Sequence, residues 1–166
     1  AMPGHYVQAE YANRIEPRTR RVLRAIWGNG PYVEGWAVYT QRMMSDEGYL
    51  DNSLALRLSM LKQMLRGQAN TILDIRLQTM GMSEQQALDL MINQTYQERE
   101  EATAKFQRAQ LSSCQLAMYY AGSMAWQALR EHYKQRHPQD YTLAGFHERA
   151  LNEGAVPLPM LERLLQ

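Results

Sequence analysis

The amino-acid sequence predicts an all-α fold, a multi-helix domain with little or no β-structure. Methionine (11 residues), leucine, glutamine, arginine and alanine are abundant, and most of these residues favour helices. Strand-like alternation of β-branched residues is rare along the 166 residues. Proline, glycine and helix-capping residues separate the apolar stretches, so each stretch is expected to form one helix.

The N-terminal quarter of the chain predicts three helices. Pro3-Gly4 interrupts whatever precedes it, and a helix is expected from His5 to about Arg14. Proline suits the first turn of a helix, so a second helix is expected at residues 17–27. A Gly-Asn-Gly-Pro loop at residues 28–31 leads into a third helix over residues 31–45.

A longer helix follows a turn at residues 48–51. Asn52 or Ser53 can cap its start, and it is expected to end before Gly81. Gly67 inside it lowers helix stability by about 1 kcal/mol relative to alanine. The helix carries apolar residues near one face: Leu54, Leu58, Leu61, Leu65, Ile72 and Ile75.

The C-terminal half is also expected to be helical. Capping-box patterns begin at Ser83 and Thr95, which predicts helices from there to about Ile92 and Ala109. The most apolar helix is expected over residues 111–137, before Pro138, and another over residues 142–153, closed by Gly154. A short turn of helix follows the Pro-Leu-Pro sequence at residues 157–159. Residues 1–166 are therefore interpreted as a single all-α domain.

Composition excludes some classes of protein. The net charge of +1 gives no field strong enough to indicate a nucleic-acid partner or an anionic membrane. The only basic run, at residues 18–24, is interpreted as a solvated helix face, or alternatively as a rim that attracts substrate carboxylates. No apolar window is long enough for a membrane span. The single cysteine, Cys114, allows no intrachain disulfide and is interpreted as a buried packing residue.

Two residues stand out for metal chemistry. His5 follows a Pro-Gly break, and Glu34 heads the sequence Glu-Gly-Trp-Ala in the third predicted helix. Catalytic zinc takes three protein ligands, commonly two histidines and a glutamate, and keeps a fourth position open. The alternatives are a solvated or helix-terminal histidine, and a carboxylate that the helix dipole favours in a first turn.

Five stretches in order resemble the C-terminal region of the bacterial domain-of-unknown-function 885 family. They are residues 3–8, 33–39, 72–87, 110–122 and 146–161. Members of that family are helical and zincin-like and are regarded as metallopeptidases or their relatives. The resemblance implies that this chain is the C-terminal portion of a larger helical zincin-like fold.

The resemblance also implies roles for particular residues. His5 matches the last histidine of a His-Glu-x-x-Pro-Gly-His motif, whose His-Glu pair would fall just before Ala1, and Glu34 matches the carboxylate ligand of zinc. Asp74 matches an aspartate near the site and is a candidate for supporting the ligands. A surface contact of Asp74 with Arg76 or Lys62 is the alternative.

Two tyrosines and two glutamines bear on catalysis. Tyr119 or Tyr120 is a candidate for stabilising an oxyanion, because a tyrosine hydroxyl often does so in zinc peptidases. A buried aromatic stripe is the alternative. Gln41 and Gln78 replace ionisable residues that relatives commonly have, a glutamate and a histidine, which puts activity in doubt. His132, His137 and His147 have no ligand spacing and are interpreted as structural or solvated.

Two functional hypotheses result. In the first, the intact protein is a zinc-dependent hydrolase that acts on a peptide substrate, and this chain is inactive alone because one histidine ligand and the general-base glutamate are missing. In the second, the chain is a non-catalytic all-α module that binds a partner or forms a homodimer through exposed apolar helix faces. The resemblance implies that family members are often exported to the periplasm or cell envelope, but the compartment of this protein is left open.

Overall fold

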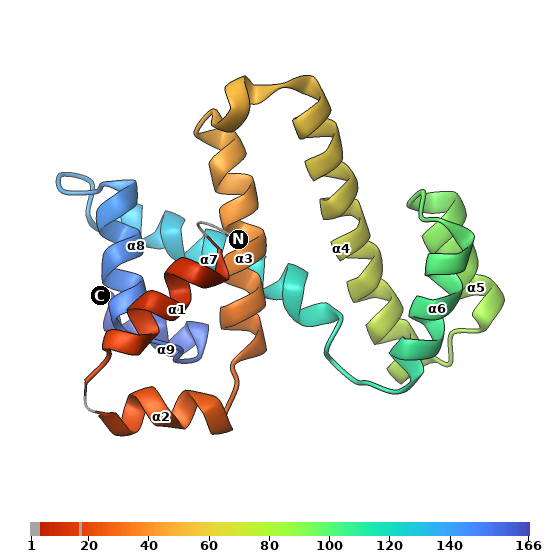
Figure 1. The fold of residues 1–166 in the computed structure, drawn as a ribbon, viewed down its shortest axis with the longest axis horizontal. Coiled ribbons are helices and arrows are strands. Elements are labelled where there is room, and N and C mark those ends of the chain that lie inside the picture. The colour runs from red at the N-terminus through yellow and green to blue at the C-terminus, as the bar shows by residue number, and fades with distance from the viewer. Residues whose placement is uncertain (1–3, 17) are drawn as a thin grey trace. The chain divides into compact units, whose positions relative to one another are not determined.

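The computed structural model describes residues 4–16 and 18–166 and confirms the all-α fold. Within these residues there are nine α-helices and no strand (Figure 1). The helices are α1 His5–Arg14, α2 Arg18–Ile26, α3 Gly30–Asp46, α4 Leu54–Met80, α5 Glu84–Leu88, α6 Arg99–Gln110, α7 Ala117–Arg136, α8 Leu143–Asn152 and α9 Leu158–Leu164. A 3-10 helix, Tyr49–Asn52, precedes α4, and a π-helix, Asp89–Gln94, follows α5.

The chain forms two compact units. The first contains the described residues up to Gln41 together with Ala121–Gln166, and the second contains Arg42–Tyr120. The core of the first unit is aromatic, with Trp36 and Trp126 edge to face at a centroid distance of 5.0 Å. Tyr32 and Phe146 are also buried there. Burial of these large rings contributes apolar area that stabilises this unit.

Two glycines let α3 and α7 approach closely in the first unit. A Cβ atom built on Gly35 would overlap the backbone of Gly122, and one built on Gly122 would overlap the carbonyl oxygen of Pro31. The two backbones are therefore in direct contact, which only glycine permits at these positions. This contact fixes the segment of α3 that carries Glu34.

Helix α2 uses its arginines to hold it against the first unit. Arg20 donates to the carbonyl oxygen of Glu153, while Arg21 and Arg24 donate to the backbone and side-chain oxygens of Asn13. The basic run is therefore not a purely solvated face. Pro17, which the sequence places in the first turn, lies outside the described residues.

The second unit is built on α4. Ser53 caps its start by accepting from the backbone N–H of Leu56, and Gly81 ends it with a left-handed conformation. Helix α6 lies beside the C-terminal half of α4, and α5 packs against α6 (Figure 1). Leu73, Met91 and Phe106 belong to one buried cluster in this unit. The capping box at Ser83 is confirmed, because its side chain and that of Gln86 exchange the predicted hydrogen bonds.

The sequence prediction was wrong at two helix starts. Thr95 does not cap a helix: its hydroxyl bonds to the carbonyl oxygens of Leu90 and Met91, and α6 begins only at Arg99. Residues 111–116 are not helical, and α7 begins at Ala117. Cys114 in that segment has φ of +62° and is exposed, so its interpretation as a buried packing residue was also wrong.

The apolar face of α4 is not part of a core. Five of its residues are between 38% and 82% exposed: Leu54, Leu58, Leu61, Ile72 and Ile75. The residues of α4 that are buried, Ala69, Leu73 and Asp74, lie on the side that packs on the rest of the second unit. Among the described helices, none is both long and apolar enough to cross a membrane.

Candidate metal half-site and its surroundings

His5 and Glu34 lie together in the first unit. The Nε2 atom of His5 is 3.4 Å from Oε2 of Glu34, and their side chains are 48% and 29% exposed. His5 is the first residue of α1, and Glu34 lies in the first turns of α3. The structure thus brings together the two residues that the sequence motifs single out, with solvent access to both.

Two hydrogen bonds hold the start of α1 against α3. The indole N–H of Trp36 donates to the carbonyl oxygen of Gly4 at 3.1 Å, and the buried amide of Gln8 donates to the carbonyl oxygen of Tyr32 at 3.2 Å. Gly4 is the N-cap of α1. Because these bonds lie on both sides of His5 along the chain, they hold the backbone of His5 beside α3, from which Glu34 projects.

The geometry of this pair fits zinc. Two ligands at about 2.0–2.1 Å from one tetrahedral zinc ion lie about 3.3–3.4 Å apart, which agrees with the observed separation. A charge-assisted hydrogen bond would be shorter, at about 2.7–2.9 Å. Imidazole nitrogen and carboxylate oxygen are also ligands that zinc prefers. The pair therefore fits two corners of a zinc site.

The described residues do not supply a third ligand at this point. Across residues 4–16 and 18–166, no group of three or more His, Cys, Asp and Glu side chains converges on one position. Pro3, to which the sequence assigns part of the bend before His5, lies outside the described residues. His5 and Glu34 form a half-site, and their role as ligands stays a prediction.

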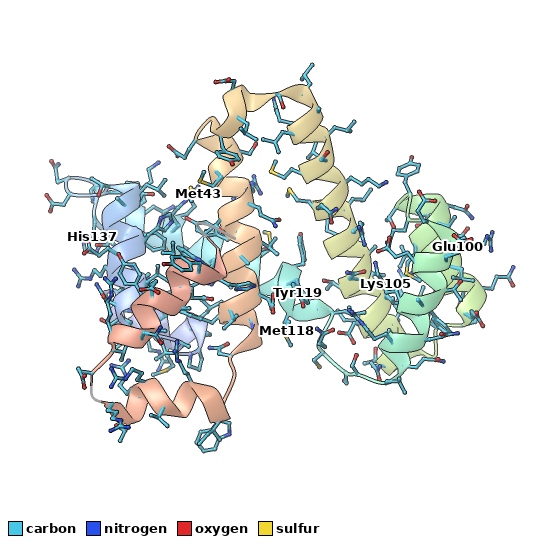
Figure 2. All side chains as sticks on the ribbon, in the orientation of Figure 1. Met43, Glu100, Lys105, Met118, Tyr119 and His137 are labelled. Atoms are coloured by element: carbon cyan, nitrogen blue, oxygen red, sulfur yellow. The ribbon has the colours of Figure 1, made fainter. Side chains whose placement is uncertain are left out.

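Tyr119 and Tyr120 belong to the second unit. They are half-buried in the first turn of α7, where Figure 2 labels Tyr119, and the hydroxyl of Tyr119 accepts from the amide of Gln115 at 3.3 Å. Neither residue is part of a fully buried aromatic stripe. Their assignment to oxyanion stabilisation stays a prediction.

Asp74 anchors the connection that leads into α7. It is 3% exposed and accepts from the backbone N–H groups of Cys114 and Ala117 at 3.2 and 3.0 Å. One turn later, Gln78 donates to the carbonyl oxygens of Ala109 and Ser112 at 2.9 and 2.8 Å. Asp74 is thus not at a surface position, and its role near a metal stays a prediction.

The hydrogen bonds of Asp74 and Gln78 explain why these two residue types suit their positions in α4. The carboxylate of Asp74 accepts two backbone N–H groups at the start of a helix, where a negative charge is favoured. The amide of Gln78 has two N–H groups and donates to two carbonyl groups. Gln78 therefore has a local structural role in this chain.

Sequence reasoning missed a buried polar network in the first unit. The hydroxyl of Tyr39 is 2.8 Å from Nε2 of His147, and the guanidinium of Arg130 lies 5.7 Å from the centre of the Tyr39 ring. Burial and, to a smaller extent, the positive charge of Arg130 lower the pKa of His147 to about 4, so its ring is neutral at pH 7. Burial raises the pKa of Tyr39 to about 12.

A second missed network joins α4 to α6. Glu101 pairs with both Arg66 and Lys105, and Nζ of Lys105 also donates to the side chain of Gln97. Figure 2 shows Lys105 on the side of α6 that faces α4. Burial, with the charges of Arg66 and Arg108, lowers the pKa of Lys105 to about 8. Glu101 and Lys105 are four residues apart on α6, a spacing that favours pairing, but Arg66 is 35 residues from Glu101, so no local pattern indicated the link to α4.

The remaining histidines have structural surroundings. His132 lies on the surface, 2.7 Å from a carboxylate oxygen of Glu162 that Arg136 also contacts at 3.2 Å. His137 packs against the ring of Tyr133 at a centroid distance of 4.3 Å. The His132–Glu162 pair differs from His5–Glu34 in being short enough for a hydrogen bond and in having a cation beside it.

These features define the class: an all-α protein in which the starts of two helices bring a histidine and a glutamate within metal-sharing distance. The chain belongs to the family described as bacterial protein of unknown function (DUF885), whose model matches residues 1–165. This agrees with the family that the sequence resembles. No curated protein matches the chain.

Two solved structures share the fold. One is a protein from Shewanella oneidensis described as a candidate lipoprotein of unknown function, with 43% identity and a TM-score of 0.91. The other is a candidate lipoprotein from Colwellia psychrerythraea, with 28% identity and a TM-score of 0.90. Each match covers 99% of this chain but only 29% and 28% of the other chain. The chain therefore spans less than a third of the length of these relatives.

Proposed function

We propose that His5 and Glu34 are two of three protein ligands of a zinc site, and that the site belongs to a zinc-dependent hydrolase acting on peptides. The 3.4 Å separation of His5 Nε2 and Glu34 Oε2 carries this proposal. The family resemblance supports it, because that resemblance implies ligand roles for these two residues, and the family model covers both of them. The second histidine and the general-base glutamate would come from a longer form of the protein.

The roles of this chain's residues follow from their chemistry. His5 offers the lone pair of Nε2, and Glu34 offers a negative charge that compensates part of the charge of a divalent cation. Bound zinc would supply a Lewis acid that polarises a carbonyl group and makes water more acidic. The hydrogen bonds of Trp36 and Gln8 hold the start of α1 against α3, so the backbones that carry the two ligands are positioned before a metal binds.

Zinc titration of the 166-residue chain by isothermal calorimetry tests the half-site. We expect one zinc ion per chain, and loss of at least about 10-fold in affinity for His5→Gln and for Glu34→Gln, since even supporting residues of metal sites contribute about 10–100-fold. His132→Gln is the matched control, because it removes a histidine from another surface His–Glu pair. Equal affinity in the wild type and both site variants would exclude the proposal.

Catalysis requires a separate test. The family's His-Glu pair is not among these 166 residues, so we expect no peptide hydrolysis by the chain alone, with or without zinc. A longer form that carries the pair should hydrolyse peptides, and Glu34→Gln should lower that activity together with zinc content. Zinc-dependent turnover by the 166-residue chain would contradict the assigned roles.

A further inference from the structure

The exposed side of α4 has the spacing of a coiled-coil seam. Apolar residues follow one another at alternating intervals of three and four, with one polar interruption at Gln68. The seam consists of Leu54, Leu58, Leu61, Leu65, Gln68, Ile72 and Ile75. A strict alternation of this kind produces a narrow apolar stripe that fits another helix, and a single polar residue in it sets the register.

This seam has no partner within the second unit. Leu54 and Leu58 are 82% and 70% exposed, and Ile75 is 51% exposed, so the stripe is open at both ends. Helix α6 packs instead against the side of α4 that carries Ala69 and Leu73. An apolar stripe of this length on a 27-residue helix is typical of an interaction surface.

The charges beside the seam select the partner. Arg57, Lys62 and Arg76 occupy the positions that flank a coiled-coil seam, and all three are exposed. Asp74 is the only acidic residue in α4, and it is buried and bonded to backbone N–H groups. A second copy of α4 would place like charges together in either orientation, which disfavours self-pairing.

A groove continues the surface at the start of the seam. It has a volume of about 400 Å³, and its lining consists of Arg42, Ser45, Asp46, Arg57, Met60, Leu61 and Met64. Methionine side chains adapt to differently shaped apolar groups. Arg42 pairs with Asp46 at 3.9 Å, so Arg57 is the cation of the groove that we assign to an incoming carboxylate. The groove therefore extends the apolar surface of the seam.

We propose that α4 is a docking surface for an amphipathic helix that has an apolar heptad seam and acidic residues on both flanks. The two solved relatives extend well beyond the shared fold, since the match covers only 29% and 28% of their chains. A helix from that part of the family fold is the source that we assign. This proposal is independent of the zinc half-site.

Two labelled peptides of about three heptads test the recognition chemistry. Both carry leucine and isoleucine at the seam, and they differ only in having glutamate or lysine at the flanking positions. Fluorescence anisotropy with the 166-residue chain should show the glutamate peptide binding at least about 10-fold more tightly than the lysine peptide. Only the glutamate peptide places negative charges beside the positive charges that flank the seam of α4. Equal affinities, or no binding of the glutamate peptide, would overturn the proposal.

Variants locate the contact. Leu58→Ser combined with Ile72→Ser should abolish binding of the glutamate peptide, whereas Val22→Ser with Ile26→Ser, which changes exposed apolar residues of α2, should leave it intact. Arg57→Glu with Lys62→Glu should reverse the preference in favour of the lysine peptide. Helix content by circular dichroism checks that each variant is folded.

The oligomeric state of the chain tests whether a second copy of the chain, instead of an acidic helix, occupies the seam of α4. Analytical ultracentrifugation of the chain without peptide should show no dimer that depends on the seam. A dimer that Leu58→Ser with Ile72→Ser dissociates would show that a second copy occupies α4, and would overturn the assignment to an acidic helix.

Discussion

His147 shows at the scale of single residues how burial controls protonation. Its ring packs against Trp36 at a centroid distance of 5.2 Å and contacts the Tyr39 hydroxyl, and burial lowers its pKa from 6.5 to about 4. An imidazole in the unfolded chain titrates near 6.5. Between these two pH values the unfolded state binds more protons than the folded state, so acid destabilises the fold.

Stability of the first unit should therefore fall as the pH is lowered from about 6.5 to 4. We expect a loss of about 2 kcal/mol from His147, less than the full shift implies because the ring is partly exposed. Urea unfolding followed by tryptophan fluorescence measures it, since Trp36 and Trp126 are buried in this unit. The variant His147→Gln cannot titrate and should show a smaller pH slope; an unchanged slope would contradict the assignment.

Sequence reasoning found the residues that local motifs mark, and missed those that only tertiary contacts define. His5 and Glu34 stand at a Pro-Gly break and in the Glu-Gly-Trp-Ala motif, and the family resemblance implied that they share a site. Tyr39 lies just after the Glu-Gly-Trp-Ala motif, but its partner His147 is 108 residues away, and nothing in the sequence pairs the two. Asp74 was noted for a role near a metal, but its two backbone hydrogen bonds depend on where residues 114–117 pass.

Helix boundaries at the scale of elements were predictable where a local signal sets them. Ser53, Ser83, Thr142 and the glycines after α4 and α8 all behave as their types predict. The two errors, at Thr95 and at residues 111–116, have different causes. The hydroxyl of Thr95 bonds to carbonyl groups four and five residues earlier and so is not available as a cap. Residues 111–116 are instead held by Gln78 and Asp74, which are more than 30 residues away in sequence. Tertiary contacts override local propensity at such points.

The crossing of α3 and α7 gives a prediction for two glycine substitutions. Gly35→Ala places a methyl group against the backbone of Gly122, where no flexible side chain can move aside. We expect it to lower the free energy of unfolding by about 3 kcal/mol. Urea unfolding followed by circular dichroism measures the change.

Gly67→Ala in α4 is the matched control. It also lies inside a helix, but a Cβ atom there meets nothing within 4 Å. We expect an increase in stability of about 0.5–1 kcal/mol, because alanine loses less backbone entropy in a helix than glycine. Similar effects at both positions would show that the close contact of α3 and α7 does not carry stability.

At the scale of the whole molecule, the sequence predicted the helical fold but could not decide whether the apolar face of α4 is buried or exposed. The apolar stripe of α4 was visible as a pattern, yet the same spacing serves a buried helix and a docking helix equally well. Only the exposure of Leu54, Leu58 and Ile75 decides between them. Likewise, the motifs at His5 and Glu34 indicated a metal site, but their separation came from the packing of α1 on α3.

The most direct test of the metal half-site is an anomalous difference map from crystals of this chain soaked in zinc, recorded at the zinc absorption edge. We predict a peak about 2.0–2.1 Å from both His5 Nε2 and Glu34 Oε2. A peak at the His132–Glu162 pair in place of this one, or no peak beside His5, would contradict the claim that His5 and Glu34 share a metal ion.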